Sequence, residues 1–133
     1  ASRCVRQFST KFESDKKRFM ERFLCSGMIG DGDLHLKNLS MLVEHNSSFV
    51  NCELSPAYDI LSLAGLSGYY ANTILPVNGT QEPTVDDFAF VGEHYLDIPP
   101  DDTKMMAKRM AQKCLKSIGQ FCTIRIQFAP EGN

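Results

Sequence analysis

An apolar segment that ends in a turn of glycine and aspartate defines the first third of this chain. Apolar side chains between residues 15 and 28 recur at helical spacing, and Ser14 is the expected N-cap. Gly27 weakens this helix and Gly30 ends it, since glycine readily takes the left-handed conformation of a helix C-cap. The pattern predicts one helix over residues 15–28, followed by a polar loop over residues 30–38.

This loop leads directly into a predicted β-hairpin. Residues 39–43 and 49–54 are strand-like and flank a turn-rich connection, and Pro56 ends the second strand. A short helical turn over residues 57–63 and a short strand over residues 73–77 are expected next.

Two helices are predicted in the last third. Thr84 and Asp87 have the spacing of a capping box, which predicts a helix over residues 85–96. Pro99-Pro100 separates it from a second helix that runs to Gly119 with a stripe of methionines, which we interpret as core packing.

The two ends of the chain give weaker signals. Residues 1–13 show no clear period, whereas apolar and polar side chains alternate over residues 121–128 and predict a strand. Because the elements show no regular β-α-β alternation, the expected fold class is α+β, mostly helical, in one domain over residues 1–133.

Length and composition exclude several classes of protein. With 133 residues, 43% of them apolar, the chain can bury a core of its own. No apolar stretch approaches the roughly 20 residues of a membrane span, and no secretory signal is visible, so a cytoplasmic location is expected. The five cysteines have no CxxC spacing and are expected to be reduced, and the three histidines lie too far apart in sequence to indicate a zinc site.

Charge is segregated along the sequence. Residues 24–100 hold ten acidic residues and one basic residue, Lys37, between two basic flanks. The acidic middle is either a set of solvated loops or a cation-binding region. A pI of about 5.9 argues against direct nucleic-acid binding, because binding to phosphates requires an excess of positive charge.

The acidic middle contains three oxygen-bearing side chains at informative positions. Asp33 and Asn38 lie five residues apart in the loop between helix and hairpin, and Asp59 follows the hairpin. In protein kinases a catalytic-loop Asp, an Asn five residues later and a second Asp after a hairpin perform phosphoryl transfer with magnesium. Carboxylate and amide oxygens are the ligands that Mg²⁺ prefers, which explains these residue types.

The sequence GDGDLHLKN (residues 30–38) followed by LSPAYD (residues 54–59) resembles the HipA-type serine/threonine kinases, which are toxins of bacterial toxin–antitoxin systems. The resemblance extends to the preceding helix and to LPVNG (residues 75–79). It covers about residues 16–115, whereas residues 1–15 and 119–133 match poorly. The implied fold is a mostly helical, protein-kinase-like C-terminal lobe with a catalytic-loop hairpin.

This resemblance implies a role for each matching residue. Asp33 is implied to be the catalytic base, Asn38 and Asp59 the ligands of Mg²⁺, and Asp31 a structural loop residue. The remaining matched residues are implied to line the ATP site together with the two metal ligands: His35, Leu36, Lys37 and Tyr58.

The resemblance also implies partners and a missing part. A kinase of this type carries an N-terminal lobe with a phosphate loop, but only 32 residues precede Asp33 here, so we expect an incomplete kinase that is inactive alone. The implied partners are a helix-turn-helix antitoxin and a protein substrate, for which the resemblance allows an aminoacyl-tRNA synthetase. The predicted strand after Phe121 departs from the family, which continues with helices.

Two other interpretations stay open. In the first, the chain is a non-catalytic, kinase-like interaction module or one subunit of a split kinase. Alternatively, Asp31 and Asp33 form the nucleophile motif of a haloacid-dehalogenase-like phosphatase, which requires Asp31 at the end of a buried strand.

Overall fold

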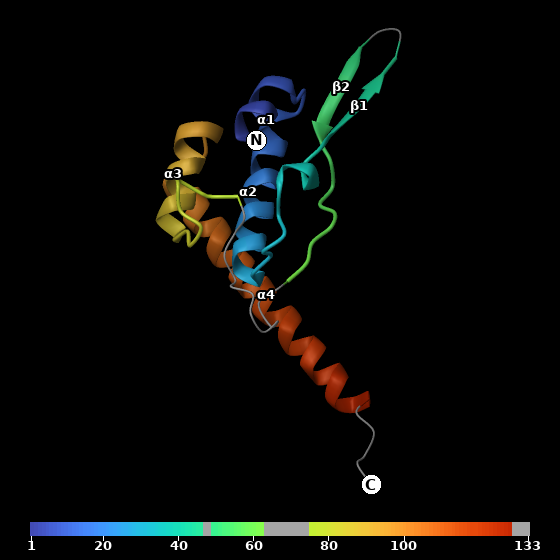
Figure 1. Cartoon of the computed structure of the whole chain (residues 1–133), viewed down its shortest axis with the longest axis vertical. Helices are drawn as coiled ribbons and strands as arrows, with labels where there is room; N and C mark the ends of the chain where they lie inside the picture. Colours follow the sequence, from blue (N-terminus) through green and yellow to red (C-terminus); the bar gives the residue numbers. More distant parts are fainter. Residues whose placement is uncertain (47–48, 63–74, 129–133) are drawn as a thin grey trace.

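The computed structural model describes residues 1–46, 49–62 and 75–128. It confirms the α+β class with a predominance of helix. Figure 1 shows an antiparallel hairpin at one end and the long last helix projecting from the other. The elements in chain order are α1 (Ser2–Phe8), α2 (Phe12–Ile29), the 3₁₀ turn η1 (Leu36–Asn38), β1 (Met41–His45), β2 (Val50–Leu54), α3 (Val85–Leu96) and α4 (Pro100–Phe128).

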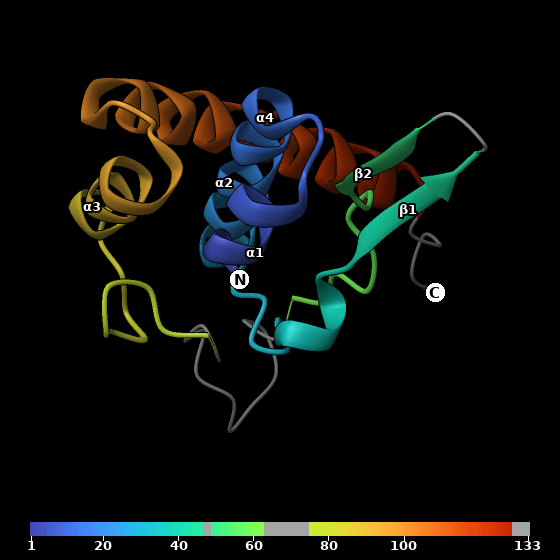
Figure 2. The same ribbon diagram turned by 90° about the horizontal axis from the view of Figure 1, so that it is seen from above.

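Helix α2 is the central element of the fold. Figure 2 shows α4 crossing it, with α3 on one side and the hairpin on the other. The helix begins at Phe12, earlier than predicted, and ends as expected on Gly30, whose φ of 66° is left-handed. No helix among the described residues combines the length and apolarity that crossing a bilayer requires.

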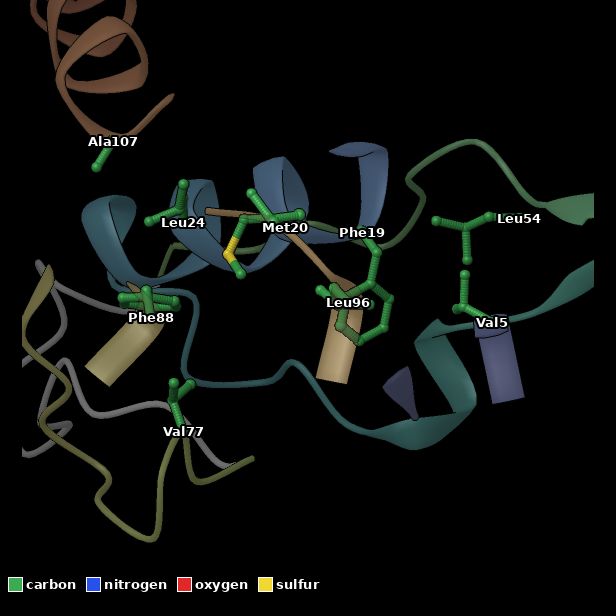
Figure 3. Packing of buried hydrophobic residues seen from close by; sticks show 10 residues of the cluster. Val5, Phe19, Met20, Leu24, Leu54, Val77, Phe88, Leu96 and Ala107 are labelled. Carbon is green, nitrogen blue, oxygen red and sulfur yellow. The ribbon is translucent and has the colours of Figure 1, made fainter. Parts of the chain in front are cut away.

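The core forms where α2 meets its neighbours. Phe19, Met20 and Leu24 of α2 are at most 4% exposed and pack against buried side chains from α3, while Val5 of α1 lies opposite Leu54 of β2 (Figure 3). Burying such apolar side chains contributes roughly 1.5–3 kcal/mol each, and α2 supplies three of them to the core.

Two predicted features of the last third are confirmed, the second of them in part. Thr84 accepts a hydrogen bond from the Asp87 backbone N–H, and the Asp87 carboxylate accepts one from the Thr84 backbone N–H. A hydrogen bond from Asn78, together with those from Thr84, holds the pKa of Asp87 below its usual value. The methionine stripe of α4 is confirmed as core packing only at Met106, since Met110 and Cys114 are half-buried and lie outside the core cluster.

Two expectations at the ends of elements are wrong, and one further helix was not predicted. Residues 121–128 continue α4 instead of forming a strand, because helical hydrogen bonds are satisfied locally whereas a strand requires a neighbour. Residues 57–62 form no helical turn, since Asp59 has a left-handed φ of 52°. Residues 2–8 form α1, whose seven residues and single buried side chain, Val5, leave almost no periodic signal.

The expected strand over residues 73–77 is reduced in the described part to one bridge between Val77 and Thr80. Residues 63, 73 and 74 of these predicted segments lie outside the described residues.

Helix α3 packs tightly against α4 at Gly92. A Cβ there would lie 2.6 Å from Oγ1 of the buried Thr103 and 3.3 Å from Cε of Met20. Gly92→Ala is therefore expected to lower the free energy of unfolding by about 1–3 kcal/mol, because neither neighbour can move freely. Gly119→Ala, with open space around it, is expected to leave the melting temperature unchanged or raise it slightly. Thermal melts test this pair, and equal effects of the two substitutions would contradict the packing described.

Candidate functional site

The site is built around the predicted metal ligands, which the fold brings together. Asn38 lies in η1 and is 2% exposed, and its Nδ2 donates a hydrogen bond to Asp59 Oδ2 at 2.8 Å across 21 residues of sequence. Asn38 Oδ1 accepts from the backbone N–H of His35 at 2.9 Å. These two bonds fix the Asn38 amide. Asp59 is exposed to solvent, and its Oδ1 takes no part in the bond to Asn38.

The hairpin carries Asp59 back to the loop. Strands β1 and β2 pair in antiparallel register from Met41 opposite Leu54 to His45 opposite Val50. The Ser55 backbone N–H then donates to the carbonyl of Ser40 at 2.9 Å. The chain therefore leaves the hairpin beside the residues through which it entered.

Asp33 is placed by a buried aspartate. Asp31 is 1% exposed, and its Oδ2 accepts from Ser26 Oγ at 2.7 Å. Its Oδ1 accepts from the Asp33 backbone N–H at 3.3 Å. Asp31 thus has the structural role expected for it, and the partly exposed Asp33 side chain is held on an anchored backbone.

Tyr58 connects the segment before Asp59 to the loop. Its hydroxyl donates to the carbonyl oxygen of Lys37 at 2.7 Å. Lys37 itself is exposed, and its ammonium takes part in none of the ion pairs between described residues. The Lys37 side chain is therefore free to meet a ligand phosphate.

The predicted site residues fall into separate sets. Hydrogen bonds join His35, Asn38 and Asp59 in one set and Lys37 and Tyr58 in another. Leu36 is 60% exposed and lines a cavity of about 480 Å³ between α2, α3 and residues 75–79, which no other predicted site residue lines. The Asp33 backbone is bound to Asp31, and no hydrogen bond between described residues joins Asp33 to the other predicted site residues.

Tyr58 is also held by a residue that the sequence did not indicate, Arg22. Arg22 of α2 donates from Nη2 to the Tyr58 carbonyl at 2.7 Å, and its guanidinium lies 5.4 Å from the centre of the Tyr58 ring. Arg22 is 8% exposed. A basic residue on a helix predicts a solvated charge, so no sequence signal marked this contact.

A second missed residue supports the hairpin. Asp15 of α2 is fully buried, and its Oδ2 accepts from the Leu54 backbone N–H at 2.7 Å and from Ser9 Oγ at 2.8 Å. Its Oδ1 accepts from Arg18 Nη1 at 3.0 Å. Asp15 therefore fixes the end of β2, five residues before Asp59.

Comparison with known protein families assigns the chain to one family. The family model described as "HipA-like C-terminal domain" matches residues 1–118. The chain belongs to the HipA-like C-terminal domain family. Searches of curated proteins and of solved structures found no match.

This HipA-like domain differs from the phosphatase alternative in local structure. A haloacid-dehalogenase-like nucleophile requires a strand that ends at Asp31, whereas here α2 runs to Ile29 and Gly30 caps it. The phosphatase interpretation is therefore wrong. The helical continuation of α4 through Phe128 also removes the predicted departure from a family that continues with helices.

The donor set fits a magnesium ion bound together with a nucleotide. No three His, Cys, Asp or Glu side chains gather in a metal-binding cluster within the described ranges. Mg²⁺ does not need such a cluster, because it is commonly held by one or two carboxylates, substrate phosphates and water. Asn38 Oδ1, with a second lone pair, and Asp59 Oδ1 would supply the protein oxygens.

Proposed function

We propose that this domain is the magnesium-binding and base-bearing part of a HipA-like serine/threonine kinase, which transfers the γ-phosphoryl group of ATP to a protein hydroxyl. The observation that supports it most strongly is the direct bond between Asn38 and Asp59, two residues that the kinase pattern assigns to one metal. The membership in the HipA-like family supports the same assignment.

In this proposal each residue of the site has a defined task. Asn38 and Asp59 hold the cation, which when bound neutralises charge on the phosphates. Lys37, the single base between residues 24 and 100, contacts a phosphate oxygen. Asp33 accepts the proton of the substrate hydroxyl while the hydroxyl oxygen forms a bond to the γ-phosphorus. The bond between that phosphorus and the ADP oxygen breaks, and ADP leaves.

The 133 residues contain no glycine-rich phosphate loop. We propose that the complementary ATP contacts come from outside this sequence, so that these residues alone bind Mg–ATP but transfer phosphate negligibly. The substrate is then a protein hydroxyl presented to Asp33. A helix-turn-helix antitoxin is the partner that the family suggests.

Thermal melting with metal and nucleotide tests this proposal. Mg²⁺ with ATP is expected to raise the melting temperature, with a stabilisation of about 2.7 kcal/mol when the ligand is present at 100 times its dissociation constant. Asp33→Asn is expected to keep this rise, because the base does not hold the metal. Absence of any shift at millimolar Mg–ATP would contradict the proposal and favour a non-catalytic interaction module.

A further inference from the structure

Arg22, whose Nη2 binds the carbonyl of Tyr58, also lines a second cavity. The cavity has a volume of about 270 Å³ and lies between α2, the segment after β2 and Met110 of α4. It is smaller than the 300–1,000 Å³ of typical organic-ligand pockets, so its size suits a small ion with water.

Two buried polar side chains that line this cavity have unmet hydrogen-bonding capacity. Arg22 is 8% exposed and its Nε has no hydrogen-bond partner; Ser55 is 7% exposed and its Oγ has none either. A buried donor without a partner costs about 1–3 kcal/mol. Neither atom is accessible to solvent in this structure, but both side chains line the cavity, so a ligand there that accepts hydrogen bonds would remove this cost once the side chains turn toward it.

The charge of Arg22 indicates the sign of that ligand. Among the described residues, no carboxylate forms an ion pair with this guanidinium. A buried charge is costly unless it is paired, and a bound anion would pair it.

The other charged groups near the cavity are consistent with an anion. Arg18 lines it and is paired with Asp15 on one side only, through Nη1. Glu21 also lines it but is exposed. The nearby Asp31 carboxylate is already engaged by Ser26 and by the Asp33 backbone.

We propose that Arg22 and Ser55 form a binding site for a phosphate-class oxyanion, either free inorganic phosphate or the phosphate of a phosphorylated side chain. Guanidinium groups bind such oxyanions through parallel charge-assisted hydrogen bonds, and the hydroxyl of Ser55 adds a donor from a second element. None of the residues of the proposed Mg–ATP site lines this cavity, although Arg22 also binds the carbonyl of Tyr58.

Cys25 provides a reporter inside this cavity. It lines the cavity, and its thiol is partly buried. Burial raises the pKa of the Cys25 thiol, and neighbouring Cys114 and Asp31 raise it further. Alkylation of Cys25 is therefore slow but measurable at alkaline pH, and an anion beside Arg22 would slow it more.

Melting curves without metal or nucleotide test the proposal. Inorganic phosphate is expected to raise the melting temperature of the unmodified protein by a few degrees relative to chloride at equal ionic strength. The rise should be lost in Arg22→Met and in Ser55→Ala. Ser55→Ala removes no existing side-chain hydrogen bond, so it should fold even if Arg22→Met does not.

Arg109→Met, at an exposed position of α4, and Asp59→Asn serve as controls and should keep the response. Phosphate should also slow alkylation of Cys25 but not of the exposed Cys4. Phosphoserine in place of phosphate distinguishes the two sources: an equal or larger rise indicates a phosphorylated side chain, and a smaller one the free ion. Equal shifts in all variants, no shift, or a response to acetate alone would overturn the proposal.

Discussion

Replacing Asp15 by alanine is expected to lower the free energy of unfolding by about 3 kcal/mol, since charge-assisted hydrogen bonds contribute roughly 1.5–3 kcal/mol each and a buried donor is left behind. The carboxylate is fully buried and accepts the Leu54 N–H at 2.7 Å. Without it, that N–H has neither a protein acceptor nor water. Urea unfolding followed by circular dichroism measures the loss.

Two matched substitutions serve as controls for Asp15→Ala. Asp15→Asn keeps the shape and one acceptor oxygen, so a smaller loss is expected. Glu21→Ala changes an exposed carboxylate of the same helix and should stay within about 0.5 kcal/mol of the unmodified protein. If Asp15→Ala were no more harmful than Glu21→Ala, Asp15 would not support the hairpin.

Replacing Asp59 by asparagine is expected to remove the stabilisation by Mg–ATP, with at least a roughly tenfold loss of metal affinity. Asp59 supplies the charge of the Asn38–Asp59 pair, and an amide in its place is neutral. The fold should survive, because asparagine tolerates the left-handed φ of 52° at this position. Melting temperatures with and without Mg–ATP measure the effect.

Asp97→Asn is the matched control. Asp97 is also an exposed aspartate with a φ of 52°, but it ends α3 and pairs with Arg6. It should keep the full response to Mg–ATP. A response kept by Asp59→Asn as well would show that Asp59 is not a metal ligand.

The parts of the fold that were predictable from sequence depend on local signals. Gly30 ends α2 because its left-handed conformation is a property of the residue itself. The capping box at Thr84 is likewise contained in four residues. The spacing of Asp33, Asn38 and Asp59 carried the site prediction, and the hairpin register confirms that it brings Asn38 and Asp59 together.

The parts that were missed depend on contacts between distant residues. The roles of Asp15 and Arg22 come from partners 39 and 36 residues away, so neither appears in a periodic pattern. Residues 57–62 form no helical turn, and Tyr58 among them is held by Arg22 from a distant part of the sequence. Over residues 121–128, alternation alone could not show that the sheet has only the strands β1 and β2 in the described part of the chain.

Paramagnetic broadening by Mn²⁺ tests the central claim most directly, because Mn²⁺ takes the same oxygen ligands as Mg²⁺ and broadens NMR signals near its site. In the isotopically labelled protein with ATP, the side-chain amide of Asn38 and the backbone signals of Asp59 should broaden first, and excess Mg²⁺ should restore them. Broadening at other acidic residues, with Asn38 and Asp59 unaffected, would contradict the assignment of these two residues as the metal site.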